Sequence, residues 1–429
     1  MATHHGSTIV RWLAHAVSRI FYRVDRAGRV PVVGATLLLP NHPNALLDPA
    51  LVWATAGRDV RFLAKSTLFD GAFGPVLKAA GAIPVYRRLD QGVDVSRNVD
   101  TFAAVDAALA ARQAICIFPE GISHSSGRLE PLRTGAARMA LAAERKGTHV
   151  HLVAVGLNFD RKTAFRSRVT VLYGRPFDVR DLARAGDDQL TVRLATERIA
   201  EHMRRLLVEA DPEADAILIT RVERLYAAAR GPARSPEERI DRRRAIALGM
   251  TRLREAHGER FTSIAVRLRR YDQRLRRFRL RDRHLDWDVS ARAASRFMLR
   301  EGALAIVLVP LAIVGLVIFW IPYHVTGWLA RLPAKERDVA ATAQVFVGAA
   351  VYAVWLAAIV AVIGWLVDGV AAAVAAALLP LLAIAGLFAV ERETSAIGAA
   401  RAWLALRRAR SRSRSRLREE RSEIAELLD

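Results

Sequence analysis

A histidine and an aspartate stand close together in the stretch PNHPNALLDP, at residues 40–49. His42 and Asp48 are the residue types of a base and its orienting carboxylate. The aspartate accepts a hydrogen bond from one ring nitrogen, which fixes the tautomer, and the other nitrogen removes a proton from a hydroxyl group. Such a pair, standing alone, is more often structural than catalytic. The interpretation therefore depends on the residues that accompany it.

Three further stretches carry residues that suit an anionic substrate. Residues 81–88 (GAIPVYRR) end in Arg87 and Arg88, and a guanidinium group can bind two phosphate oxygens at once. Residues 117–124 (IFPEGISH) end an apolar run, and residues 132–137 (LRTGAA) are typical of a strand-to-helix turn that could meet an anion. Because α/β sheets usually bind ligands beyond the carboxyl ends of their strands, these stretches predict a site for a phosphorylated molecule.

The elements that must position these residues follow from alternating β-rich and helical runs over residues 30–190. This alternation predicts an α/β domain with a mostly parallel sheet flanked by helices. The predicted strands are 32–39, 60–64, 83–85, 114–118, 151–157 and 169–172, and the predicted helices are 100–112 and 135–146. Cys116 falls inside an apolar strand pattern, so we interpret it as a core residue and not as a nucleophile.

The order and spacing of these motifs across residues 30–180 resemble the glycerolipid acyltransferase family, whose members acylate glycerol 3-phosphate or lysophosphatidate. The family's blocks are matched by Asn41, His42 and Asp48, by Gly81 with Arg87, by FPEG at 118–121 with the basic-Thr-Gly turn at 133–135, and loosely by 152–157. The last block has Ala154 where the family favours proline, and five residues, not four, separate His42 from Asp48. The longer spacing looks like the branch that contains the fungal glycerol-3-phosphate and dihydroxyacetone-phosphate acyltransferases.

The resemblance implies a PlsC-like acyltransferase fold and a role for each matched residue. His42 would be the general base toward the glycerol hydroxyl, which attacks the thioester of acyl-CoA or acyl carrier protein, and Asp48 would orient His42. Arg87 would hold the acceptor phosphate, and Glu120 and Gly121 would bind or position the glycerol phosphate. Second-rank candidates are Arg88, Ser123, His124 and Arg133. The resemblance implies no metal and no cofactor besides the acyl donor.

The identity of the acceptor stays open at this point. The branch resemblance favours glycerol 3-phosphate, and the same chemistry on lysophosphatidate, dihydroxyacetone phosphate or another lysolipid is the alternative. A catalytically dead membrane scaffold with the same fold is a third interpretation. The presence of His42, Asp48, Arg87 and Glu120 disfavours it.

Long apolar runs near the carboxyl end predict a membrane region over residues 301–391. A bilayer core needs about 20 apolar residues per helix. Residues 339–390 have room for a helical hairpin that turns at Asp368 and Gly369, and residues 303–321 form a separate apolar run.

The basic segments around these runs decide the preferred topology. Positive charge marks the cytoplasmic side, and arginine-rich stretches lie at 267–283, in the linker 331–337 and at 407–416. Three full spans would put these stretches on different sides of the membrane. We therefore expect the hairpin to span and 303–321 to be re-entrant or interfacial, as a helix broken at its prolines, with three spans as the alternative.

The remaining segments are predicted to be helical. Residues 1–29 contain an amphipathic helix at 8–24, which suits a membrane surface or the protein's own core. Residues 191–300 are predicted to be a basic helical region with an interruption at 211–212, and residues 392–429 a basic helical cytoplasmic tail.

The composition agrees with a membrane enzyme. The chain has 429 residues, a formal net charge of +22 and 52% hydrophobic residues, which excludes wholesale disorder. A single cysteine excludes a disulfide scaffold and a cysteine-based zinc site. Anionic membrane lipids as partners explain the charge surplus, so nucleic acid, the rival partner for so basic a chain, is not required. We expect an integral protein of a bacterial cytoplasmic membrane, with its catalytic domain facing the cytoplasm.

Overall fold

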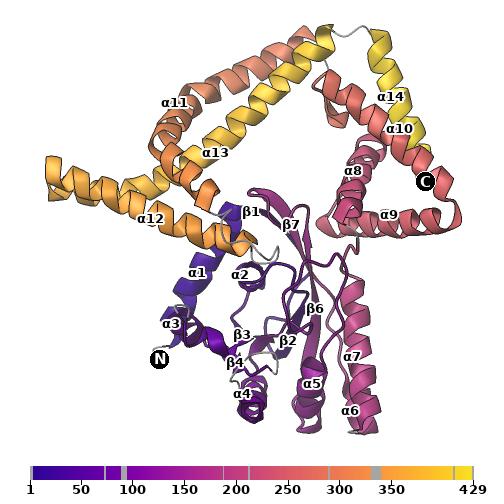
Figure 1. Ribbon diagram of the computed structural model, residues 1–429, viewed down its shortest axis with the longest axis vertical. Helices are drawn as coiled ribbons and strands as arrows, with labels where there is room; N and C mark the ends of the chain where they lie inside the picture. Colours follow the sequence, from indigo (N-terminus) through magenta and orange to yellow (C-terminus); the bar gives the residue numbers. More distant parts are fainter. Residues whose placement is uncertain are drawn as a thin grey trace. The chain divides into compact units, whose positions relative to one another are not determined.

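The computed structural model describes residues 3–71, 74–87, 94–186, 188–210, 213–287, 290–329, 340–408 and 411–427 (Figure 1). The chain divides into two compact units. The first comprises Met1–Leu218, Arg234–Ala247 and Lys335–Thr342, and the second comprises Ile219–Ala233, Leu248–Ala334 and Ala343–Asp429.

The first unit is built on a mostly parallel sheet. Among the described residues its strands are β1 (Tyr22–Ala27), β2 (Ala35–Pro40), β3 (Val60–Lys65), β4 (Ile83–Val85), β5 (Ala114–Cys116), β6 (Val150–Phe159) and β7 (Ser167–Tyr173). They lie in the order β1-β7-β6-β2-β5-β3-β4. Only β6 and β7 pair antiparallel within this order. The predicted α/β domain with a mostly parallel sheet is therefore confirmed.

Helices cover this sheet. They are α1 (Thr3–Phe21), α2 (Leu47–Thr55), α3 (Gly74–Ala79), α4 (Asn98–Ala110), α5 (Gly135–Arg145), α6 (Arg180–Ala185) and α7 (Gln189–Arg204). Helices α5 and α7 run side by side (Figure 1). They share one hydrophobic core with α4 and the central strands, formed by residues such as Leu37, Leu39, Leu109, Ile115, Leu141, Leu152 and Ile199. Cys116 is fully buried in its strand, as expected for a core residue.

The amino-terminal segment departs from its prediction. The expected helix at 8–24 ends at Phe21, and Tyr22 to Ala27 instead form strand β1, which pairs with β7 about 140 positions further on. The prediction is therefore wrong for residues 22–24. Tyr22 is 1% exposed, and this burial in the sheet outweighs the helical pattern that precedes it.

The region between the sheet and the apolar runs is helical, as expected. It contains α8 (Glu213–Arg230), α9 (Pro236–Ala256), α10 (Gly258–Arg277) and a short 3-10 turn, η3 (Asp282–His284). The interruption expected at 211–212 lies outside the described residues. Within the first unit, two arginines of α9 bind carboxylates of the sheet domain: Arg239 binds Asp25 at 2.7 Å, and Arg243 binds Asp160 at 2.7 Å.

The apolar runs form three long helices, α11 (Ala291–Leu329), α12 (Ala340–Leu366) and α13 (Gly369–Arg408), and α14 (Ser411–Glu426) follows. By length and composition, parts of all three could cross a membrane. The turn expected at Asp368 and Gly369 is present, and Asp368 Oδ1 caps α13 by accepting from Ala371 N at 2.6 Å. The helix expected to break at Pro310 and Pro322 is instead continuous through both, which membrane helices tolerate.

Candidate active site

The predicted base lies at the carboxyl end of the central strand β2. Asn41 follows the strand, and its side-chain amide makes two bonds with Leu157 of β6: Nδ2 donates to the Leu157 carbonyl at 3.2 Å, and Oδ1 accepts from Leu157 N at 2.8 Å. This pairing extends the β2–β6 ladder by side-chain atoms. The loop that carries His42 is therefore tied to the sheet where it begins.

His42 and Asp48 form the expected pair. His42 Nδ1 lies 2.9 Å from Asp48 Oδ2, and the same oxygen accepts a hydrogen bond from Asn44 N at 2.6 Å. Asp48 lies in the first turn of α2, where the helix dipole favours a carboxylate, and its side chain is fully buried. Burial raises the pKa of the Asp48 carboxyl, and the hydrogen bond from His42 opposes this shift. Since Nδ1 faces Asp48, Nε2 is the nitrogen left to receive a substrate proton.

The loop of residues 118–124 contacts His42 from a second side. The ring of Phe118 stacks on the His42 ring, with centroids 4.0 Å apart and planes at 22°. Glu120 Oε1 accepts a hydrogen bond from His42 N at 2.7 Å, and His124 N donates to the His42 carbonyl at 3.1 Å. The structure therefore brings together two motifs that are about 80 residues apart in the sequence.

Glu120 is 2% exposed, and both of its oxygens accept bonds. Oε2 contacts His124 Nε2 and accepts from Glu130 N at 3.0 Å, while Oε1 holds His42 N. Burial disfavours the charged form of His124, but the contact with Glu120 outweighs it, so the pKa of His124 is raised above its ordinary value of 6.5.

Two of the predicted arginines meet at Gly121. Arg87 Nη1 donates to the Gly121 carbonyl at 2.9 Å. Arg133 N donates to the Pro119 carbonyl at 2.7 Å, and a Cβ placed on Gly121 would lie 3.1 Å from Arg133 Cγ. Gly121 also has φ of +76°, so glycine is required here both for the backbone conformation and for the close approach of Arg133. Ser123 lies in the same loop, half-buried, and Arg88 lies outside the described residues.

Sequence reasoning missed the residues that support Asp48 from behind. Asn44 is fully buried, and its Nδ2 donates to the Tyr22 hydroxyl at 2.7 Å. The Tyr22 hydroxyl in turn donates to the Lys162 carbonyl. Phe118 belongs to the FPEG motif, but the motif does not predict its contact with His42. Asn44 lies inside the PNHPN run, but its partners come from distant segments that no local pattern connects to it.

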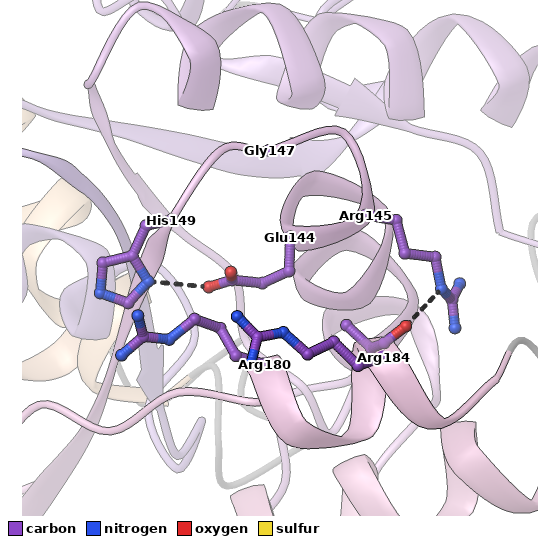
Figure 2. Close-up of a pocket in the computed structure, with 7 residues that line it drawn as sticks. Glu144, Arg145, Gly147, His149, Arg180 and Arg184 are labelled. Atoms are coloured by element: carbon purple, nitrogen blue, oxygen red, sulfur yellow. Dashed lines mark hydrogen bonds and ion pairs between the residues drawn. The ribbon is translucent and has the colours of Figure 1, made fainter.

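A separate cavity lies at the opposite ends of the strands (Figure 2). It has a volume of about 410 Å³ and is lined by Glu144, Arg145, Gly147, His149, Arg180, Ala183 and Arg184. Glu144 Oε1 accepts from His149 Nδ1 at 3.0 Å and from Val150 N at 2.8 Å, and Arg145 Nε donates to the Ala183 carbonyl at 3.4 Å. Because β6 begins at Val150, this cavity lies at the amino end of the strands, away from His42. Within the described residues no cluster of three or more potential metal ligands occurs.

Comparisons with known proteins agree with this geometry. Residues 20–157 match the sequence model of the family described as Acyltransferase. Glycerol-3-phosphate O-acyltransferase 2 of Saccharomyces cerevisiae is 38% identical over 84 residues, which are 19% of this chain and 11% of that protein. Glycerol-3-phosphate O-acyltransferase 1 of the same yeast is 41% identical over 73 residues, 17% of this chain and 10% of that protein.

Two further relatives are more distant. An uncharacterized acyltransferase of Schizosaccharomyces pombe is 26% identical over 191 residues, 43% of this chain and 27% of that protein. The crystal structure of PlsC, the 1-acyl-sn-glycerophosphate acyltransferase of Thermotoga maritima, matches with a TM-score of 0.35 and 15% identity, over 46% of this chain and 77% of that one.

The matches to the curated relatives cover between 10% and 27% of those proteins' lengths. The family match covers residues 20–157 and therefore includes the positions of His42, Asp48, Arg87 and Glu120. The domain that contains these residues matches the acyltransferase family model and is similar to the two yeast glycerol-3-phosphate O-acyltransferases.

Proposed function

We propose that this protein transfers a fatty acyl group from a thioester donor to a hydroxyl of glycerol 3-phosphate, with His42 as the general base. The observation that carries the proposal is the His42–Asp48 pair, joined at 2.9 Å at the carboxyl end of β2. The names of the two yeast relatives support glycerol 3-phosphate as the acceptor.

The chemistry follows from the orientation of the pair. His42 Nε2 takes the proton of the acceptor hydroxyl while its oxygen attacks the thioester carbonyl. The carbon–sulfur bond then breaks as the new ester forms, and the proton on His42 passes to the leaving thiolate. Asp48 stabilises the imidazolium that exists between these two steps. No acyl-enzyme is needed, and the only cysteine is buried in the core.

Arg87 and Arg133 are proposed to bind the acceptor phosphate. Both contact Gly121, in the loop that also contacts His42. Two guanidinium groups near the base would hold a dianionic phosphate and leave the hydroxyl of the same small molecule within reach of Nε2. Ser123 lies in the same loop and is a candidate for a weaker contact.

The helices α11, α12 and α13 support a membrane location for this reaction. An acyl donor with a long chain and an acylated product both partition into lipid. We propose that the sheet domain works on the cytoplasmic side of a membrane and takes acyl-CoA or acyl carrier protein as donor. The basic segments near the apolar helices suit an anionic leaflet.

An acyl-transfer assay on membranes that contain the full chain tests the proposal. Labelled long-chain acyl-CoA is supplied with glycerol 3-phosphate or with lysophosphatidate, and wild type is compared with His42→Ala and with His257→Ala, an exposed histidine outside the site. We expect label in lysophosphatidate with wild type and His257→Ala, and none with His42→Ala. Incorporation of label only when lysophosphatidate is the acceptor would mean that the enzyme acylates lysophosphatidate and not glycerol 3-phosphate. Transfer by His42→Ala at the wild-type rate would refute the general base.

A further inference from the structure

Glu120 is held too completely by the protein to be a free substrate ligand. Its carboxylate is 2% exposed and accepts from two backbone N–H groups, those of His42 at 2.7 Å and Glu130 at 3.0 Å, besides contacting the His124 ring. A buried carboxylate requires such partners, because an unpaired one is costly inside a protein. The acceptor would have to displace one of them to bind Glu120.

The same contacts enclose the backbone of His42. Its N–H donates to Glu120, and its carbonyl accepts from His124 N at 3.1 Å. The His124 side chain then closes the arrangement by contacting Glu120 Oε2. Both backbone groups of His42 are therefore hydrogen-bonded to the loop 118–124, while Asp48 binds its ring.

We propose that Glu120 and His124 are positioning residues, which set the place of the His42 ring through its backbone and do not bind the acceptor. The proposal rests on the acyl transfer proposed above. A displacement of about 1 Å in a catalytic group can cost roughly 10²-fold in rate, so a loosened His42 loop should lower turnover before it affects acceptor binding.

The test compares His124→Ala with His124→Gln, because glutamine can keep a donor near Glu120 Oε2 without the charge. We expect His124→Ala to lower kcat by about 10²-fold with little change in the acceptor KM, and His124→Gln to restore most of the rate. A raised acceptor KM with an unchanged kcat, in His124→Ala or in Glu120→Gln, would overturn the proposal.

Hydrogen exchange separates this proposal from the proposed reaction. The amide of His42 should exchange faster in His124→Ala than in wild type, whatever the protein acylates, because its acceptor Glu120 then keeps only the bond from Glu130 N to hold its other oxygen. Unchanged exchange of residues 41–45 in His124→Ala would refute the positioning role even if acyl transfer is found. Faster exchange in a protein without acyltransferase activity would leave the positioning intact and refute the reaction.

A second, independent inference concerns the membrane helices. The segment before α11 and the helix after α13 are bound to each other within the second unit. Arg414 Nε and Arg418 Nε both donate to the Leu285 carbonyl, at 2.8 Å and 2.9 Å. Arg421 binds both carboxylate oxygens of Asp286, at 2.6 Å and 2.9 Å. Two flanks joined in this way must lie on the same side of a membrane, which requires an even number of crossings between them.

Helices α11 and α13 pack antiparallel, as an even number of crossings demands. At one end, Glu301 of α11 binds Arg392 of α13 at 3.1 Å. Further along, Gly315 and Gly386 let the backbones approach, since a Cβ on Gly315 would lie 3.0 Å from Gly386 Cα. The residue numbers rise along α11 and fall along α13 between these two contacts. The apolar stretches of both helices therefore begin at the Glu301–Arg392 pair and run side by side.

Helix α12 connects the far ends of this pair. Trp355 Nε1 donates to the Ile318 carbonyl at 2.9 Å, and the ring of Tyr352 lies 5.9 Å from that of Phe319. Both contacts are in the half of α11 distant from Glu301. Aromatic residues that typically mark a membrane interface gather at the ends that α12 joins: Trp320, Tyr323, Trp328 and Trp365, all exposed.

We infer that α11 and α13 cross the membrane as an antiparallel pair and that α12, which is apolar on all sides, lies within the lipid of the far leaflet without crossing. This arrangement replaces the expected hairpin of 339–390 with a re-entrant 303–321. It agrees with the earlier expectation that the stretches 267–283 and 407–416 share one side, and it departs from the expectation that the linker 331–337 shares that side as well. The positive charge of these stretches places that side in the cytoplasm.

Labelling of single introduced cysteines with a membrane-impermeant maleimide distinguishes the topologies. The substitutions are Ser290→Cys, Gly327→Cys, Gly369→Cys and Ser422→Cys, all at exposed positions, and wild type is the unlabelled control because Cys116 is buried. We expect positions 290 and 422 to be labelled from the cytoplasmic side, and positions 327 and 369 from the other side.

Each alternative gives a different pattern. If residues 339–390 form a spanning hairpin, position 327 would be labelled from the same side as position 290, and only position 369 would be labelled from the far side. Three spans would put 369 with 290 and move 422 to the far side. Either pattern, or labelling of all four positions from one side, would overturn the inference.

Discussion

The two units of this protein hold their charged groups in different ways. In the sheet unit, Asp48 and Glu120 are buried and each bonds to a backbone N–H of the loop it supports. In the second unit, arginines of α10 and carboxylates of α14 pair at the surface, as in Arg267 with Glu423 at 2.7 Å. Buried bonds of the first kind are few and costly to break, whereas exposed pairs are individually weak and act in number. Single substitutions at buried groups such as Asp48 and Glu120 should therefore have much larger effects than substitutions at exposed pairs such as Arg267 with Glu423.

The largest expected effect is on turnover, in Asp48→Asn. The asparagine amide can donate to His42 Nδ1, which leaves the proton on Nε2 and removes the base, so kcat should fall roughly 10²–10⁴-fold. Burial raises the pKa of Asp48 above its ordinary value of 3.8. The folded state therefore loses stability as the pH rises from 3.8 through the raised pKa, because the unfolded chain ionises first. Asparagine cannot ionise, but an amide nitrogen that donates to His42 cannot also accept from Asn44 N, so these two effects oppose each other and the thermal unfolding midpoint at neutral pH should change little.

Assays and thermal unfolding of Asp48→Asn beside Asp59→Asn, which changes an exposed aspartate, check this separation. A parallel loss of stability and activity in Asp48→Asn would mean that Asp48 is mainly structural.

The next largest effect is expected for Arg87→Ala. If Arg87 binds the acceptor phosphate as proposed, loss of this charge-assisted bond costs about 1.5–3 kcal/mol, or about 10- to 100-fold in the acceptor KM. Arg87→Lys keeps the positive charge but cannot bind two phosphate oxygens at once, so its acceptor KM should lie between those of wild type and Arg87→Ala. The saturation curve for glycerol 3-phosphate measures this, with Arg128→Ala as a matched control on an exposed arginine. If acceptor saturation is unchanged in Arg87→Ala, its phosphate role is wrong.

A smaller effect is expected from pH. The groups facing His124 are Glu120 and Glu130, which favour its cation, and Lys162, which opposes it. Because the folded pKa lies above the ordinary value of 6.5, the contribution of His124 to stability is complete below pH 6.5 and is lost as pH rises through the folded pKa. Unfolding midpoints measured on both sides of pH 6.5 should show this decline in wild type and a flatter profile in His124→Gln. Equal slopes in the two proteins would contradict it.

The smallest effect is expected at the surface of the second unit. Arg267→Ala should weaken the docking of α14 by only about 0.2–1 kcal/mol, because the pair is exposed and screened. Arg421→Ala should have a larger effect, since Arg421 is 6% exposed and binds both oxygens of Asp286. Hydrogen exchange of the α14 amides compares the two variants. Equal protection of the α14 amides in the two variants would contradict the expectation that buried charged groups contribute more to stability than exposed ones.

The sequence was sufficient to predict the sheet and the meeting of its motifs. His42 and Glu120 follow parallel strands that lie side by side, and the carboxyl ends of such strands share one edge. Short apolar runs bounded by turn residues placed each of these strands nearly correctly. The contact between His42 and Asp48 was predictable for a different reason, because the two residues are only six positions apart in the sequence.

The contacts that set the fine geometry could not be predicted. The bond from His42 N to Glu120 joins residues 78 positions apart and uses a backbone group, which carries no sequence signal. Strand β1 was hidden because the helical pattern before it continues to Phe21, and its partner β7 is far along the chain. The continuity of α11 through two prolines was likewise missed, because proline predicts a break in water and not necessarily in lipid.

The stacking of Phe118 on His42 has a stereochemical consequence. The lone pair of Nε2 lies in the plane of the imidazole ring, and one face of that ring is covered by Phe118 at 4.0 Å. An incoming hydroxyl must therefore approach along the ring plane and not from above it. With the plane fixed by Phe118 and the ring rotation fixed by Asp48, only one direction of approach remains. The acceptor proposed above would then have to present its reacting hydroxyl along this one direction.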